Sequence, residues 1–274
     1  MKKAIAVIQA RMSSSRLPGK VMMELNGMPI VWHIYKRAEA CKNVSEVIVA
    51  TSTHESDDIL VQFCKKYDLN VFRGSLENVL DRFLQVLRIH SERYVVRITA
   101  DCPLIHPDFI DAQIAALNLF KADTVWIKNL PKIFEGQGVM SVSMLEYINT
   151  KSNNLDDLEH VGSDYMVKNP DEFRIVKFNI PIELQQYNFR LTVDEKKDFE
   201  LIKLIYRHCQ VSTGELVSLF NVLNFLDTNK DVANINSEVE HKKYNTSITK
   251  TKDNWNNIDV VGSYTFNVDI KDTY

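Results

Sequence analysis

The chain has 274 residues, enough to bury a substantial core as one large α/β domain or as two smaller ones. Its apolar fraction of 45% and charged fraction of 25% are ordinary for a globular protein, and its formal net charge of −3 leaves no basic excess that would indicate a nucleic-acid partner. Apolar runs of about 18 residues are absent from the sequence, so we expect no membrane span.

Strand-like and helix-like stretches alternate through the first half of the chain. Short apolar runs predict strands at residues 4–8, 46–51, 70–72, 94–99 and 123–127. Apolar residues at helical spacing predict helices at 29–41, 56–67, 77–90 and 107–120. This alternation predicts an α/β fold with a mainly parallel sheet covered on both faces. Ligands of such sheets bind beyond the carboxyl ends of the strands.

The second half of the chain is less regular. We interpret residues 130–185 as an insertion that covers one side of the cleft, because turns, a strand and helices are mixed there. A strand, a turn and a helix are expected again over 189–209. Residues 246–274 are rich in Thr, Asn, Lys and Asp, and we interpret them as an appendage, either a weakly ordered tail or a small hairpin. The main domain is therefore predicted to span residues 1–245.

The cysteines and the start of the chain bear on the compartment. The cysteines at positions 41, 64, 102 and 209 form no Cys-x-x-Cys pair and no zinc-like spacing, so we expect reduced thiols. The first apolar run is five residues long. A signal peptide needs a run of roughly 7–15 residues. We therefore expect a cytoplasmic protein.

The stretch "AVIQARMSSSRLPGKV" passes from a buried strand into a cationic, hydroxyl-rich loop. Arg11, Arg16 and Lys20 lie close together there, interleaved with serines such as Ser13. Gly19 permits close approach of a ligand to the backbone, and loop amides with Arg and Lys side chains bind phosphate oxygens. The loop matches neither the P-loop nor G-x-G-x-x-G, which disfavours an NAD-dependent oxidoreductase. The alternative is a solvated basic turn.

Two aspartates far apart in sequence each follow a predicted strand. Asp101 stands in "RITADCPLI" and Asp194 in "RLTVDEKKDFELI". A carboxylate at the carboxyl end of a strand can hold Mg²⁺ against phosphates, because this ion prefers a few carboxylates together with substrate oxygens. The alternative for Asp101 is an aspartate that only forms a turn. The alternative for Asp194 is an acid in the first turn of the next helix, where it complements the helix dipole.

The stretch "FRGSLENVLDRF" offers further candidates. Arg73 and Ser75 come just after a predicted strand, and we interpret them as ligand contacts for a base or ribose. Asp81 and Arg82 lie within a predicted helix, and we interpret them as surface charges.

Glu159 and His160 in "DLEHV" form a candidate pair for proton handling or acceptor contact. Together with Gln137 they are the predicted acceptor-binding residues. For a lone histidine, a packed or exposed residue without chemistry is the alternative.

Several of these motifs together resemble a known family. They are "IQARMSSSRLPGKV", "EVIVATST", "FRGSLENVLDRF", "RITADCPLI", "EHV" and "RLTVDEKKDFELI". In this order, over roughly residues 3–240, they resemble the SpsF-like nucleotidyltransferases of polysaccharide biosynthesis. These belong to the superfamily of 3-deoxy-manno-octulosonate and acylneuraminate cytidylyltransferases. The resemblance implies a Rossmann-like, glycosyltransferase-A-type fold and transfer of CMP from CTP to an acidic sugar or related anionic acceptor.

The resemblance also implies roles for individual residues. Arg11, Arg16 and Lys20 would hold the nucleotide phosphates, with Ala10 and Ser13 in the same loop. The Mg²⁺ ligands would be Asp101 and Asp194, and Arg73 and Ser75 would lie near the nucleotide. The catalytic residues would be Arg11, Lys20 and Asp101. The superfamily also implies a homodimer, with the insertion as the contact surface.

Two departures and two alternatives accompany this prediction. Relatives usually carry glycine where this chain has Ala100, and SpsF-like chains often carry an acid where it has Met140. A glycosyltransferase that uses a nucleotide-sugar is one alternative, although its Asp-x-Asp motif is missing from "ADCPL". A nucleotide-binding module without turnover is the other.

Overall fold

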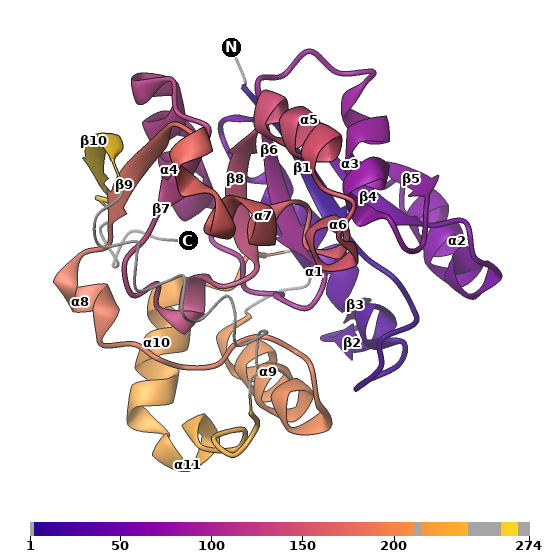
Figure 1. The fold of residues 1–274 in the computed structure, drawn as a ribbon. Coiled ribbons are helices and arrows are strands. Elements are labelled where there is room, and N and C mark those ends of the chain that lie inside the picture. The colour runs from indigo at the N-terminus through magenta and orange to yellow at the C-terminus, as the bar shows by residue number, and fades with distance from the viewer. Residues whose placement is uncertain (1–2, 211–214, 241–258, 268–274) are drawn as a thin grey trace.

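The structure, a computed structural model, describes residues 3–210, 215–240 and 259–267. These residues form an eight-stranded sheet in the order β10-β9-β7-β8-β6-β1-β4-β5 (Figure 1). The strands are β1 (Ala4–Gln9), β4 (Val44–Ser52), β5 (Val71–Gly74), β6 (Tyr94–Thr99), β7 (Thr124–Trp126), β8 (Gln137–Ser141), β9 (Ile175–Asn179) and β10 (Val260–Thr265). Neighbouring strands are parallel except where β8 pairs with β6 and β7. The predicted α/β fold with a mainly parallel sheet is confirmed.

Strand β1 shows why a continuous apolar run forms a central strand. Ala4, Ala6 and Ile8 belong to the core on one face of the sheet, while Ile5 and Val7 belong to the core on the other. Successive side chains of a strand point to opposite faces, so a strand buried on both sides needs an apolar residue at every position.

Helices cover both faces of this sheet (Figure 1). The larger core includes residues of α1 (Ile30–Glu39), α2 (Asp58–Lys66), α4 (Pro107–Phe120), α9 (Lys196–Cys209) and α10 (Leu219–Thr228). The core on the other face includes residues of α3 (Val79–Leu87) and α5 (Val142–Lys151). Shorter helices are α6 (Leu155–Glu159), α7 (Ser163–Lys168), α8 (Ile182–Gln185) and α11 (Lys230–Ala233). A two-stranded ribbon of β2 (Glu24–Leu25) and β3 (Met28–Pro29) precedes α1.

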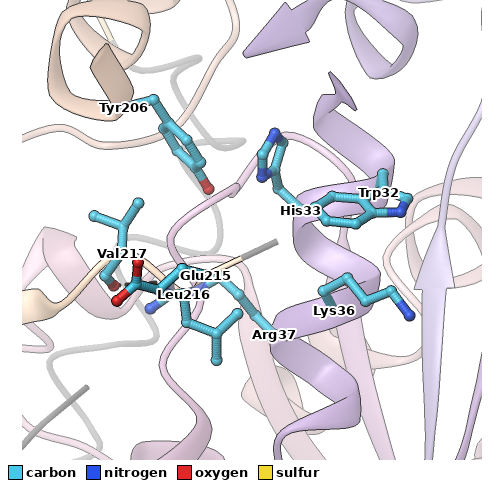
Figure 2. A pocket seen from close by; sticks show the side chains of 8 residues that line it. All are labelled: Trp32, His33, Lys36, Arg37, Tyr206, Glu215, Leu216 and Val217. Atoms are coloured by element: carbon cyan, nitrogen blue, oxygen red, sulfur yellow. Dashed lines mark hydrogen bonds between the residues drawn. The ribbon is translucent and has the colours of Figure 1, made fainter. Parts of the chain in front are cut away.

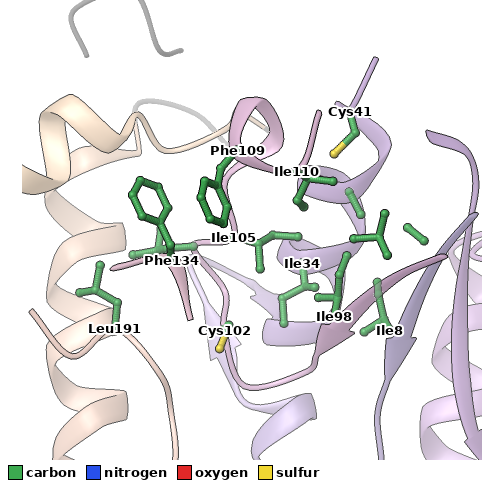
Figure 3. Close-up of a cluster of buried hydrophobic side chains, with 14 of the residues drawn as sticks. Ile8, Ile34, Cys41, Ile98, Cys102, Ile105, Phe109, Ile110, Phe134 and Leu191 are labelled. Carbon is green, nitrogen blue, oxygen red and sulfur yellow. The ribbon is translucent and has the colours of Figure 1, made fainter. Parts of the chain in front are cut away.

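The predicted helices of the first half are confirmed, with ends one to three residues shorter where capping decides the boundary. Asn78 caps α3 by accepting a hydrogen bond from the backbone N–H of Asp81. Pro107 occupies the first turn of α4, a position where its missing N–H is not needed. Figure 3 shows how Ile34 of α1 and Phe109 of α4 meet strand residues in the larger core.

The interpretation of residues 130–185 changes in one respect. This stretch supplies β8, which lies between β6 and β7 inside the sheet, and β9, so part of it is core structure and not a cover. The antiparallel direction of β8 had no signal in the sequence. The role of the remainder as a cleft cover or dimer contact stays a prediction, as does the domain boundary at 245.

The strand expected at the start of the stretch 189–209 is wrong, because residues 189–193 form no strand. These residues form an extended connection without a strand partner before α9. The backbone N–H of Val193 donates instead to the carbonyl oxygen of Asp101, at 2.7 Å. This single hydrogen bond places the connection beside the end of β6.

Part of the expected appendage also belongs to the sheet. Residues 246–258 and 268–274 lie outside the described residues, but β10 pairs in parallel with β9 at the edge of the sheet. A Cβ at Gly262 would lie 2.1 Å from the ring of Phe120, so this strand approaches α4 at a distance only glycine allows. Phe266, which is 1% exposed, packs against Phe109 and Phe178. The prediction of a weakly ordered tail or a small hairpin is therefore wrong for residues 259–267.

In the described part of the chain no helix combines the length and the apolar composition that crossing a bilayer requires. All four cysteines are buried free thiols, in agreement with the expectation of reduced thiols.

Replacing Phe266 by alanine tests whether β10 stabilises the domain. We expect Phe266→Ala to lower the free energy of unfolding by about 3–5 kcal/mol, because it removes a buried ring and leaves a cavity. The control is Val261→Ala on β10, the strand directly before Phe266, where the side chain is 37% exposed and a much smaller loss is expected. Urea unfolding followed by circular dichroism measures both, and equal stability of the two variants would contradict the packing of β10.

Candidate functional site

The loop that follows β1 is held in place at both ends. Gly19 has φ of 73°, and its N–H donates to the carbonyl oxygen of Met12 at 2.9 Å, which closes the loop on itself. Asp57, fully buried in the short helical turn Glu55–Asp57 that follows β4, accepts a hydrogen bond from the N–H of Met12 at 2.7 Å and another from that of Ser52 at 3.1 Å. Burial would raise the pKa of Asp57, but these amides and the Ser52 hydroxyl hold it below its usual range. Sequence reasoning missed Asp57.

Lys20, at the end of this loop, joins the two predicted metal aspartates. Its Nζ lies 2.9 Å from Oδ2 of Asp101 and 3.0 Å from Oδ1 of Asp194, and it donates to the carbonyl oxygen of Val193 at 2.8 Å. Burial would lower the pKa of Lys20, but Asp101 and Asp194 raise it above its usual value. The structure therefore brings together one loop cation and two acids that are 81 and 174 residues away in sequence.

Asp194 is surrounded by cations on both oxygens. Arg16 lies 2.9 Å from its Oδ1 and Arg190 lies 2.7 Å from its Oδ2. Arg190 is fixed in turn by Asp198, at 3.0 Å. Burial would raise the pKa of Asp194, but Lys20, Arg16 and Arg190 outweigh it and lower the pKa. Arg190 and Asp198 were missed in the sequence, although Asp198 is the acid that completes the capping box with Glu195 at the start of α9.

The donor set of this centre fits a magnesium ion shared with a substrate. Asp101 and Asp194 supply oxygen ligands within hydrogen-bond distance of one ammonium, so their carboxylates lie side by side. Glu135 lies nearby: burial raises its pKa, Asp101 and Asp194 raise it further, and Arg190 opposes them. Among the described residues no cluster of three or more His, Cys, Asp or Glu side chains forms a ready-made metal site. Any Mg²⁺ held by these two carboxylates needs substrate oxygens and water to complete its shell.

Arg11 points to a different part of the site. Its Nη2 lies 3.3 Å from Oε1 of Glu159, at the end of α6, and both side chains are partly exposed. The neighbouring His160 forms a hydrogen bond through Nδ1 with Oδ2 of Asp164, at 2.7 Å. Ala10 is buried and Ser13 is exposed. Glu159 is thus close to the opening loop, as an acceptor-contacting residue would have to be.

Arg73 and Ser75 arrange the carboxyl ends of β4 and β5. Arg73 donates from Nε to the carbonyl oxygen of Ser52 at 2.9 Å, and it pairs with Asp58 at 2.6 Å. The hydroxyl of Ser75 accepts from the N–H of Asn78 at 3.0 Å, just before α3. Both residues lie at the end of the sheet formed by β1, β4 and β5, and their contact with a base or ribose stays a prediction.

Gln137 and the two departures from the family pattern belong to the interior. Oε1 of Gln137 accepts from the N–H of His106 at 2.8 Å, and this side chain is 7% exposed. Ala100 is 5% exposed, and its N–H donates to the carbonyl oxygen of Gln9 at 3.2 Å, which ties β6 to the end of β1. Met140 packs in the core on the α3 face of the sheet. An acid at position 140 would therefore meet a hydrophobic core here.

The interpretation of Arg82 as a surface charge is wrong. Its side chain is 2% exposed, whereas Asp81, one position earlier, accepts a hydrogen bond from Gln85 on the outer face of α3. A Cβ at Gly74 would lie 2.9 Å from Cγ of Arg82, so the glycine leaves the space that the arginine fills.

A separate hollow lies between α1 and the segment that follows α9 (Figure 2). It is lined by Trp32, His33, Lys36, Arg37, Tyr206, Glu215, Leu216 and Val217. Arg37 is 2% exposed and donates to the carbonyl oxygens of Ile105 and Val217, at 2.5 and 2.8 Å. These hydrogen bonds connect α1 to residues 105 and 217, so we interpret the residues that line the hollow as structural.

A family model described as "Cytidylyltransferase" matches residues 5–221. The chain belongs to the cytidylyltransferase family. It is 34% identical over 229 residues to the spore coat polysaccharide biosynthesis protein SpsF of Bacillus subtilis, which covers 81% of this chain and 95% of that protein. The family predicted from the opening loop and the later motifs is thereby confirmed.

Two further comparisons agree with this assignment. The 3-deoxy-manno-octulosonate cytidylyltransferase of Geobacter sulfurreducens is 37% identical over 114 residues, which are 41% of this chain and 44% of that protein. The structure of a cytidylyltransferase from Leptospira borgpetersenii superposes with a TM-score of 0.75 at 24% identity, over 89% of this chain and all of that one. At this identity the structural likeness concerns the fold alone.

The ion pairs of Asp194 make a prediction about acid stability. Because folding lowers its pKa from the ordinary 3.8, the stabilisation is complete above that pH and is lost as the pH falls through the lower pKa of the folded state. We expect Asp194→Asn to be about 2–3 kcal/mol less stable than the wild type at neutral pH, and this difference to narrow in acid. Urea unfolding at a series of pH values measures it. Asp231→Asn, at an exposed acid of α11, is the control, and a difference for Asp194→Asn that does not change with pH would contradict the ion pairing.

Proposed function

We propose that this cytidylyltransferase transfers CMP from CTP to an acidic sugar or related anionic acceptor, with release of pyrophosphate, in the biosynthesis of a surface polysaccharide or glycoconjugate. The observation that carries the proposal is the contact of Lys20 with both Asp101 and Asp194 at the carboxyl edge of the sheet. The family supports nucleotidyl transfer. The names of two relatives, SpsF and the 3-deoxy-manno-octulosonate enzyme, support polysaccharide biosynthesis and a sugar-acid acceptor.

In the proposed reaction an acceptor oxygen attacks the α-phosphorus in line, and the bond to the bridging oxygen of pyrophosphate breaks. Negative charge grows on that leaving oxygen. Arg11, Arg16 and Lys20 would offset this charge, because positioned cations in a cleft stabilise a developing anion more than water does. Asp101 and Asp194 would hold Mg²⁺, which when bound neutralises phosphate oxygens. The ammonium of Lys20 would leave the carboxylates and turn to the phosphates.

The remaining predicted residues would surround the two substrates. Ala10, Ser13, Arg73 and Ser75 would contact the nucleotide from the ends of β1, β4 and β5. Glu159 and His160 would face the acceptor, and Asp164 would fix the ring of His160 through its hydrogen bond to Nδ1. Gln137, which is 7% exposed, would reach the acceptor only through Nε2, which has no partner among the described residues. A cytoplasmic location and a homodimer formed through residues 130–185 are part of the same proposal.

The decisive experiment follows pyrophosphate release from CTP and Mg²⁺ with a panel of sugar acids and phosphorylated alditols, and identifies products by mass spectrometry. We expect one acceptor class to yield a CMP conjugate. We expect Asp101→Asn and Lys20→Met to lower turnover by about a hundredfold to a thousandfold, as loss of a contact to a developing anion does. Lys36→Met removes an exposed lysine paired with Glu39 and should keep wild-type turnover. Product formation from a nucleotide-sugar, without release of pyrophosphate, would indicate a glycosyltransferase. Binding of CTP without formation of any product would indicate a nucleotide-binding module that lacks turnover.

Removing divalent cations tests the assignment of Asp101 and Asp194. We expect EDTA to stop pyrophosphate release and added Mg²⁺ to restore it. In Asp194→Asn the Mg²⁺ concentration that restores half of the activity should rise, because one of two protein carboxylates is lost. Full turnover in EDTA would be incompatible with a metal held by these acids.

A further inference from the structure

Arg82 is a buried charge without a hydrogen-bond partner. Its side chain is 2% exposed, and neither Nε nor Nη1 meets an acceptor within the residues that the structure describes. A buried guanidinium is strongly unfavourable unless an anion or several carbonyl oxygens pair with it. The space for its stem is provided by Gly74, where any larger residue would collide with it. Within the described ranges, the fold thus accommodates an arginine that forms no ion pair.

The charges that act on Arg82 belong to the opening loop and its support. Burial, and to a smaller extent Arg11, lower the pKa of Arg82 to about 10, and Asp57 opposes them. Asp57 does not compensate the charge by hydrogen bonds, since its oxygens accept from Met12 and Ser52. The like charge of Arg11 is near enough to lower this pKa, and among the described residues Arg11 pairs with the partly exposed Glu159. Two guanidinium groups therefore lie near each other with few acceptors beside them in the described part of the chain.

The other cations of the loop are already paired. Arg16 and Lys20 bind Asp194, and Lys20 also binds Asp101. The loop thus divides its positive charge: Arg16 and Lys20, in its second half, pair with the acids, whereas Arg11, in its first half, acts electrostatically on Arg82. In addition, Arg82 lies in the first turn of α3, where the helix dipole favours an anion.

We propose that Arg82 and Arg11 together bind one phosphate group of the nucleotide's triphosphate chain. A guanidinium presents parallel N–H donors that match two oxygens of a phosphate, and two of them can enclose one group. The bound phosphate would supply the acceptors that Nε and Nη1 of Arg82 lack. This inference rests on the proposed function for the identity of the ligand, and it assigns a residue that the sequence placed on the surface.

The test is calorimetric titration with pyrophosphate and with CTP in the presence of EDTA. We expect Arg82→Met, which keeps the length of the side chain without its charge, to weaken both ligands by about tenfold to a hundredfold, the range for hydrogen bonds to charged groups. Arg88→Met is the matched control, because Arg88 is an exposed arginine at the end of the same helix. Equal affinity of the wild type and Arg82→Met for pyrophosphate would overturn the proposal.

Thermal unfolding without ligand separates this role from a structural one. A phosphate-binding Arg82 predicts that Arg82→Met is as stable as the wild type or more stable, since a buried unpaired charge is replaced by an apolar group of similar size. Pyrophosphate should raise the melting temperature of the wild type and not that of the variant. A lower melting temperature in the variant with an unchanged response to pyrophosphate would refute the proposal.

A second variant guards against failure of the first to fold. Arg82→Lys keeps a cation in the same space but loses the fork of N–H donors, so we expect weaker pyrophosphate binding there too. Full affinity in that variant, or a wild type that does not bind pyrophosphate, counts against the site. Unchanged pyrophosphate and CTP affinities with a raised acceptor KM also overturn the assignment to phosphate. Failure of CMP transfer itself would show instead as missing product in the acceptor screen, whatever the titrations give.

Discussion

The contact of one lysine with two aspartates holds the candidate site together. Lys20 comes from the loop after β1, Asp101 from the end of β6 and Asp194 from the connection that precedes α9. At 9% exposure the lysine residue can stay charged only because both carboxylates lie beside it. Removal of one of these three side chains would leave a charge without its counter-charge in a partly buried site. The chain must therefore return after residue 185 to the same edge of the sheet before the site is complete.

This arrangement also limits how a triphosphate can enter. Around Asp194 three cations, Arg16, Lys20 and Arg190, meet three carboxylates, those of Asp101, Asp194 and Asp198. The cluster is therefore balanced in formal charge before any ligand binds. In the proposed function an incoming nucleotide would exchange partners with it: the carboxylates would hold the metal, and the freed cations would bind the phosphates. Exchange keeps each charge paired on both sides of the step, so it avoids the large penalty of exposing a buried ion to apolar surroundings.

The sequence was informative where a local pattern has a single structural solution. The apolar run of β1 could be buried only on both faces, and a parallel sheet then directs the loop with Lys20 and the turn with Asp101 to the same edge. Pairing partners are not local, which is why the inner antiparallel strand β8 and the edge strand β10 were not foreseen. The apolar "LTV" before Asp194 suggested a strand. In the described part of the chain these residues pair with no strand, and the N–H of Val193 donates a hydrogen bond to the carbonyl oxygen of Asp101.

Arg82 shows the limit of helical periodicity as a guide to burial. Its neighbours Phe83 and Leu84 are buried, Asp81 is on the outside, and on a helix the position between them is equally compatible with either side. What decides its burial is Gly74, eight residues earlier on another element, whose missing side chain opens the space. A glycine that admits a charge into the interior makes sense when something outside the chain satisfies that charge. In the proposed phosphate site, the packing of Gly74 with Arg82 and the hydrogen bond of Asp57 to the opening loop would serve ligand binding as well as the fold.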